Sequence, residues 1–164
     1  MKKRTYTTED LKKLGIRVDF NQPYTMDTKY GTVLLYKTYR KPIRGDKEVE
    51  LKPYPNVCKH PYGKDVIYWN YAIQPCQQSY QKYYNRNKKY EEYPSQMPVS
   101  RLYYIAYYGE IEGTYDVDHI DNNKFNNRIE NLQAITRKAN IAKRMLPTHE
   151  EWVEMIKKYN KKEN

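Results

Sequence analysis

The chain has 164 residues and a formal net charge of +10, from 30 lysine and arginine residues against 20 aspartate and glutamate residues. This length suits one compact domain, or a small catalytic unit with an added arm. The charge favours a polyanionic partner, because Lys and Arg release counterions when they neutralise phosphates. We expect no membrane contact and no secretory signal, since no apolar run could span a bilayer and the basic N-terminus leads into no apolar segment.

Tyrosine supplies most of the aromatic residues, with 20 copies against 2 of phenylalanine. A core of this kind has limited aliphatic content and needs hydrogen-bond partners for its buried phenolic hydroxyls. The two cysteines, Cys58 and Cys76, form no C-x-x-C pair. A structural zinc site needs four ligands at close spacing, so we interpret both as ordinary reduced cysteines.

The first predicted elements alternate with turn residues. A short helix is predicted over residues 8–15, with a hydroxyl cap before it and a glycine at its end. Apolar and β-prone residues predict strands over 31–40 and 65–73. The proline and glycine residues between these strands indicate mostly loop over 42–63.

The segment over 77–94 is polar and rich in tyrosine. It can be a solvated helix that packs its tyrosines on the body, a flexible loop, or a surface on which nucleobases stack. The side chains available for stacking are Tyr83, Tyr84, Arg86 and Lys88. We favour packing against the body.

Two further helices are predicted from apolar periodicity. The first covers residues 99–108, where Val99, Leu102 and Ile105 lie on an apolar stripe that also includes Ala106, and a glycine follows. The second begins at a capping box over 148–151, close to the C-terminus.

The residues that could take part in catalysis or metal binding are concentrated between positions 110 and 144. Acidic residues crowd together there in an otherwise basic protein: Glu110, Glu112, Asp116, Asp118 and Asp121. Carboxylates repel phosphates unless a cation lies between them, so this cluster in a candidate nucleic-acid binder indicates a metal.

The local pattern in this segment predicts a ββα hairpin. Asp118 and His119 end a short β-prone run, and an asparagine-rich stretch of turn residues follows. Residues 132–135 can return as a second strand, and Thr136 can cap a helix that runs to Arg144. A strand end lets adjacent side chains approach one phosphate from different sides.

The pattern D-H-I-D-x-N-x-x-N-N-R-x-x-N-L, followed by T-x-x-x-N, resembles the HNH endonucleases, particularly the small phage and intron-encoded homing type. The resemblance is strong over 114–144 and extends weakly back to Val99, where relatives often carry V-H-R-L and this chain has Ser100 as the second residue. Relatives often have glycine at the position of Asn122, and asparagine also visits the left-handed region.

The resemblance implies an α+β fold. We expect a C-terminal ββα-metal (HNH) hairpin that follows an irregular, tyrosine-rich N-terminal region of short strands and helices. The expected organisation is a DNA-binding or structural region over 1–97, the HNH nuclease module over 98–146 and a C-terminal helix over 147–164.

The resemblance also implies a role for each motif residue. Asp118 would be a carboxylate ligand to one divalent metal ion, and Asn140 would be the second ligand through its side-chain oxygen. His119 would be the general base that takes a proton from the attacking water. Asn131 would hold the loop and orient His119, and Arg128 would either contact a phosphate or brace the loop.

Hard oxygen ligands suit one Mg²⁺ or Mn²⁺ ion per active site and leave room for water and phosphate. The basic residues expected to contact nucleic acid lie in or just after the hairpin helix: Arg137, Lys138, Lys143 and Arg144.

These residues predict a metal-dependent endonuclease, of phage or mobile-element type, that hydrolyses phosphodiester bonds in double-stranded DNA. A homodimer or a phage protein partner stays open, and so does a preference for RNA or single strands. The competing class is a non-catalytic DNA-binding or inhibitory protein that keeps the HNH scaffold. We expect the protein to act in the cytoplasm, in a bacterial host cell if a phage encodes it.

Overall fold

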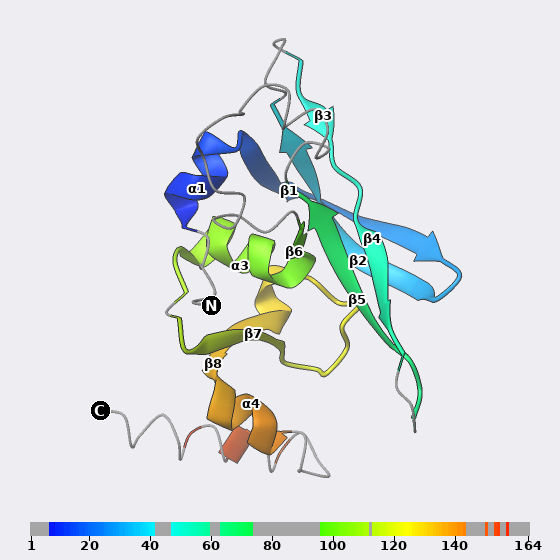
Figure 1. Ribbon diagram of the computed structural model, residues 1–164, viewed down its shortest axis with the longest axis vertical. Coiled ribbons are helices and arrows are strands. Elements are labelled where there is room, and N and C mark those ends of the chain that lie inside the picture. Colours follow the sequence, from blue (N-terminus) through cyan, green and yellow to red (C-terminus); the bar gives the residue numbers. More distant parts are fainter. Residues whose placement is uncertain are drawn as a thin grey trace, which may run out of the picture.

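The computed structural model describes residues 7–41, 47–59, 63–73, 96–111 and 113–143, together with Glu150, Val153, Glu154 and Lys157. In these ranges the chain forms three small antiparallel sheets, with strand orders β1-β2-β3, β4-β5-β6 and β7-β8. Figure 1 shows helix α3 between the first two sheets and the third, with helix α4 below.

The first element among the described residues is helix α1, Thr8–Lys13, as its hydroxyl cap and glycine predict. Thr7 and Asp10 form a capping box, in which each side chain accepts a hydrogen bond from the other residue's backbone N–H, at 3.1 and 3.0 Å. Gly15 follows with a φ of +68°, in the left-handed region that favours glycine.

Strands β1 (Ile16–Thr28) and β2 (Gly31–Arg40) form the longest hairpin among the described residues, and the short strand β3 (Val49–Glu50) joins its far end. Strand β2 confirms the prediction for residues 31–40. The expectation of short strands in this region is wrong for β1, which has 13 residues. Its pairing shifts register between Asp19 and Pro23, and this interruption hides the strand in the sequence.

The second sheet contains β4 (Tyr54–Cys58), β5 (Val66–Ala72) and β6 (Gln96–Pro98). Strand β5 confirms the strand predicted over 65–73. The loop prediction for 42–63 is wrong over β4, which includes Pro55. Strand β4 lies at the edge of its sheet, where a proline is tolerated because one row of N–H groups has no partner strand.

Helix α3 (Val99–Tyr108) has the predicted bounds and ends at Gly109, which has a φ of +100°. Val99, Leu102 and Ile105 are fully buried as predicted, but Ala106 is exposed. Tyr103 is fully buried instead.

A core rich in tyrosine is expected to provide hydrogen-bond partners for its buried hydroxyls, and the hydroxyl of Tyr103 has such partners. It lies 2.7 Å from the Tyr71 hydroxyl, accepts from the Tyr36 backbone N–H at 3.0 Å and donates to the Tyr36 carbonyl at 3.0 Å. Burial raises the pKa of Tyr103 to about 12 and also raises the pKa of Tyr71, so both phenols stay neutral.

The predicted ββα hairpin consists of β7 (Tyr115–His119), β8 (Leu132–Thr136) and α4 (Arg137–Lys143). As predicted, Thr136 caps α4, and its hydroxyl accepts from the Ala139 N–H at 3.2 Å. A single-turn helix (Ile129–Asn131) precedes β8.

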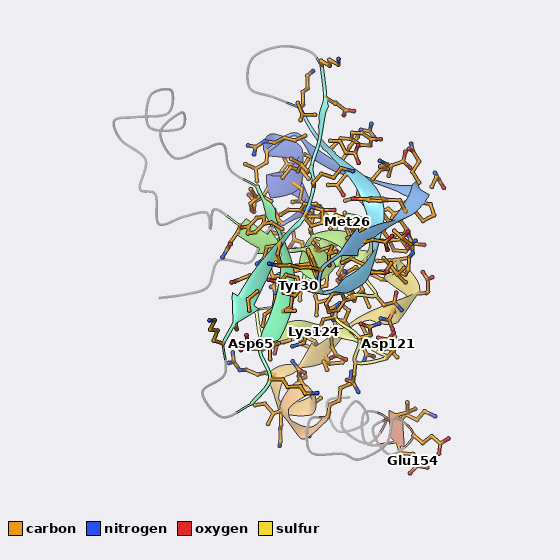
Figure 2. The ribbon with its side chains drawn as sticks, turned by 90° about the vertical axis from the view of Figure 1, so that its right-hand side faces the viewer. Met26, Tyr30, Asp65, Asp121, Lys124 and Glu154 are labelled. Carbon is orange, nitrogen blue, oxygen red and sulfur yellow. The ribbon has the colours of Figure 1, made fainter. Side chains whose placement is uncertain are left out.

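The loop between β7 and β8 returns to the first sheet. The Leu34 N–H donates to the Phe125 carbonyl at 2.7 Å, and the Asn127 N–H donates to the Leu34 carbonyl at 3.2 Å. Buried side chains of α1, β2, β5, α3 and β8 form one hydrophobic cluster. The β1–β2 hairpin therefore directly supports the loop. Figure 2 labels Tyr30, in the connection between β1 and β2, and Lys124, on the loop.

Several predictions fall on residues that the structure does not describe. The tyrosine-rich segment over 77–94 lies outside the described residues, with Tyr83, Tyr84, Arg86 and Lys88, and so does Arg144. Most of the C-terminal helix over 147–164 does too, although Glu150, Val153, Glu154 and Lys157 are helical. Among the described residues, no helix is long and apolar enough to cross a membrane.

Candidate active site

Strand β7 delivers Asp118 and His119 to the start of the hairpin loop, opposite Gln133 and Leu132 of β8. The loop then turns through Asn122, whose φ of +62° lies in the left-handed region, as the substitution of asparagine for glycine allows. The Ile120 N–H donates to the Asn131 carbonyl at 2.8 Å, which closes the loop directly behind His119.

The side chain of Asn131 clamps the loop. Its Oδ1 accepts from the Asp121 N–H at 3.1 Å, and its Nδ2 donates to the Asp121 carboxylate at 2.8 Å and to the Asn126 carbonyl at 2.9 Å. This matches the loop-holding role expected of Asn131. These bonds of the Asn131 side chain all lie within the loop, and a different residue contacts the imidazole of His119.

Asn127, rather than Asn131, contacts the histidine. Its Oδ1 lies 3.0 Å from His119 Nε2, and the Asn127 side chain is 1% exposed. The expectation that Asn131 orients His119 is therefore corrected. The sequence places Asn127 in an asparagine-rich stretch of turn residues and assigns it no catalytic role. The one available signal is the Asn126-Asn127 pair itself, because adjacent side chains in an extended chain point in opposite directions.

Burial lowers the pKa of His119 below its ordinary value of 6.5. The hydrogen bond to Asn127 and the carboxylates of Asp118 and Asp121 act in the opposite direction, and Lys124 adds to the lowering. His119 is therefore neutral at pH 7. With Asn127 Oδ1 as the acceptor, Nε2 carries the proton and Nδ1 has the lone pair that a general base needs.

A pocket of about 650 Å³ lies against this histidine. The pocket brings together Asp118, His119 and Asn140, which the sequence places on two different elements. Its lining consists of Val66, Tyr68, Pro98, Ser100, Val117, Asp118, His119, Asn122, Lys124, Asn140 and Lys143. Ser100, at the position where relatives carry histidine, thus faces the same space.

Two residues on this lining, Lys124 and Tyr68, have no role in the sequence motif. Lys124 places its ammonium 4.1 Å from the ring centroid of Tyr68, and Tyr68 is 38% exposed. Tyr68 belongs to a strand that reads as a core element, and only the packing of β5 beside the hairpin loop brings it to the pocket.

The donor set on the pocket suits a hard divalent cation in part. The Asn140 amide donates through Nδ2 to Asp116 at 3.2 Å, which leaves its oxygen as the group that would face a metal. Asp118 adds a carboxylate. Among the described residues, no three His, Cys, Asp or Glu side chains gather as a metal cluster. Two oxygen ligands still fit Mg²⁺, which usually keeps several waters and takes further oxygens from a phosphate.

Lys143 does not lie where a DNA contact was expected. It is 5% exposed, and its ammonium lies 2.6 Å from Asp118 Oδ2 and donates to the His119 carbonyl at 2.6 Å. The expectation that it contacts nucleic acid is corrected, because a buried, ion-paired ammonium is not on the outer surface. Arg137 and Lys138 are exposed at the start of α4.

Arg128 braces the loop. Its guanidinium donates to the Leu35 carbonyl and to the Tyr24 carbonyl, the latter at 3.3 Å, and lies 5.1 Å from the Tyr36 ring centroid. Of the two roles left open by the sequence, this geometry favours the brace over the phosphate contact.

Strand β7 with Asp118 and His119 at its end, the loop held by Asn131, strand β8 and helix α4 with Asn140 form a ββα hairpin. Residues 98–142 match the sequence model of the HNH endonuclease family, which supports an HNH endonuclease domain in this part of the chain. The family indicates nuclease activity on DNA and generally uses a divalent metal. No curated protein and no solved structure matches the chain.

Proposed function

We propose that this protein is a metal-dependent HNH endonuclease, of phage or mobile-element type, that hydrolyses phosphodiester bonds in double-stranded DNA. One observation carries the proposal: Asp118, His119 and Asn140 line one pocket, and a buried asparagine contacts the histidine, whose pKa is lowered by burial. That combination supplies a base and oxygen ligands at the same place.

His119 is the general base in this proposal. Neutral imidazole accepts a proton from the attacking water at Nδ1, while the bond from Nε2 to Asn127 fixes the plane of the ring. Asn131 and Arg128 act indirectly, since they hold the loop and the adjacent β2 backbone in the shape that places His119 on the pocket.

Asp118 and Asn140 would hold one Mg²⁺ or Mn²⁺ ion, which when bound supplies positive charge for the phosphate and the leaving oxygen. Asp116 positions the Asn140 amide through its hydrogen bond. Arg101 of α3 lies close enough to Asp116 for the two opposite charges to attract each other, which favours the charged guanidinium of Arg101.

Positive residues near the pocket provide the general attraction for DNA. Lys124 lies on the pocket wall, and Arg137 and Lys138 are exposed on α4. Each active site cuts one strand, so a single copy nicks a duplex, and a double-strand break needs a second copy or a phage protein partner.

The test is to incubate the purified protein with supercoiled plasmid in Mg²⁺, in Mn²⁺ and in EDTA. We expect nicked or linear product with either metal and none in EDTA, and DNA binding in a gel-shift assay that weakens steeply as salt rises. Binding without cleavage under all three conditions would reject the enzyme and favour the non-catalytic DNA-binding protein that keeps the HNH scaffold.

A further inference from the structure

Lys143 is a buried cation inside the proposed metal site. Lysine is almost never fully buried unless it is paired, and here the side chain is 3% exposed against 12% for its partner Asp118. The ammonium bridges the Asp118 carboxylate and the His119 carbonyl, both at 2.6 Å. It therefore ties the last residue of α4 to the two residues at the end of β7.

The ammonium uses the atoms that a metal would use. Asp118 Oδ2 accepts from Lys143 and also from the Gln133 amide at 3.0 Å, so this oxygen already has two donors. Lys143, Asp118 and Asn140 all line the same pocket. A divalent ion at Asp118 must either take the place of the ammonium or share the carboxylate with it.

We propose that Lys143 is a resident counter-ion that competes with divalent metal for Asp118. The inference rests on the proposed metal site and adds a regulating residue to it. In the metal-free protein the ammonium balances a partly buried carboxylate, which would otherwise lie in the pocket uncompensated. The same positive charge opposes a divalent cation at that carboxylate. The protein thus has a stable site without metal, at the expense of metal affinity.

Position along the chain also separates Lys143 from the family pattern. The family match ends at residue 142, so it does not include Lys143. Its role is carried by the burial and the two hydrogen bonds alone.

The experiment measures Mn²⁺ binding to the full, DNA-free chain by calorimetry and by the electron paramagnetic resonance signal of free Mn²⁺. The variants are Lys143→Met, which keeps the length of the apolar stem, and Lys143→Gln. Lys12→Met is the matched control, because it removes the same charge from an exposed lysine of α1, far from α4 in Figure 1. Asp118→Asn checks that the ion binds at this carboxylate.

Lys143→Met and Lys143→Gln should bind Mn²⁺ at least about tenfold more tightly than the wild type, since a neighbouring positive charge has been removed. Lys12→Met should bind like the wild type. In EDTA both Lys143 variants should melt at a lower temperature than the wild type, and Mn²⁺ should raise their melting temperature more than it raises that of the wild type.

Equal Mn²⁺ affinity of the wild type and both Lys143 variants would overturn the competition while the metal site stands. If both variants fail to fold even with Mn²⁺, Lys143 has a purely structural role, and the proposed competition is overturned as well. If no variant binds Mn²⁺, the metal site and the inference fall together. Tighter Mn²⁺ binding in the absence of plasmid cleavage would instead support the inference and count against the proposed nuclease alone.

Discussion

The two hairpins β1–β2 and β7–β8 are held together in different ways. The first has ten paired positions and a short connection at residues 29 and 30. The second has five paired positions and a connection over residues 120–131, which is shaped by side chains: the carboxylate of Asp121 and the amides of Asn123, Asn126 and Asn131. Backbone pairing tolerates many sequences, whereas a loop made by side chains requires particular residues at particular spacings.

This difference explains what could be predicted from the sequence. The ββα hairpin was predicted because its loop needs asparagines and a cap at Thr136, and these are visible as a motif. Strand β1 was missed, since its ladder requires no special residue and its register shift near Pro23 breaks the alternation. The strand β4 escaped for a similar reason, because Pro55 is acceptable only at a sheet edge and the sequence does not reveal edges.

Within the site, the sequence identified the residue types but not their partners. The resemblance implied that Asp118, His119 and Asn140 act at one site, and the structure places all three on the lining of one pocket. Two examples show how the structure determines which side chains contact each other. Asn131 and Asn127 are both asparagines of one loop, and only the packed structure shows which reaches the imidazole. Lys143 belongs to a basic stretch that predicts a solvent-facing residue, but the docking of α4 on β7 buries it.

The difference between the two hairpins predicts that, within the β7–β8 loop, substitution of Asn131 lowers stability the most. Substitution of Asn131 by alanine removes three hydrogen bonds of one side chain and should lower the free energy of unfolding by about 2 kcal/mol. Urea denaturation followed by circular dichroism measures this. Asn56→Ala, at an exposed position of β4, is the control and should change little. An Asn131 variant as stable as the control would show that side chains do not hold this loop.

Asn127 should affect cleavage more than stability. Its Nδ2 is buried and lacks a hydrogen-bond partner among the described residues, so truncation to alanine removes no hydrogen bond at that atom. Truncation does remove the hydrogen bond between Oδ1 and the His119 ring. We expect Asn127→Ala to reduce the single-turnover cleavage rate about tenfold or more, at a melting temperature closer to wild type than that of Asn131→Ala. If both variants lose activity only in proportion to their unfolded fraction, the assignment of Asn127 to His119 is wrong.

The β1–β2 hairpin is tested at Tyr103, whose hydroxyl supports the backbone of β2 rather than the β7–β8 loop. Replacing Tyr103 by phenylalanine leaves the ring in place but removes the bonds to Tyr71 and to the Tyr36 backbone. Stability should fall by about 1 kcal/mol, and the folded fraction should cleave DNA at the wild-type rate. A specific loss of cleavage at unchanged stability would mean that the first sheet participates directly in the site.

The smallest expected effect concerns pH. Burial lowers the pKa of His119, so the base stays neutral as pH falls through 6.5 and is protonated only below it. Cleavage at saturating Mg²⁺ should therefore be constant above pH 6.5 and decline below that value. Asn127→Asp, which places a carboxylate beside the imidazole, should move the decline to higher pH because it stabilises the protonated ring. A wild-type midpoint above pH 7 would contradict the neutral, half-buried base.

The central claim, that His119 is the general base of a nuclease in this hairpin, is tested most directly by the cleavage rate of His119→Ala. The rate is measured under single-turnover conditions on supercoiled plasmid with Mg²⁺, at matched folded fraction. Loss of the base should slow cleavage by on the order of a hundredfold or more, while Mn²⁺ binding at Asp118 and Asn140 persists. Cleavage by this variant at close to the wild-type rate would contradict the account.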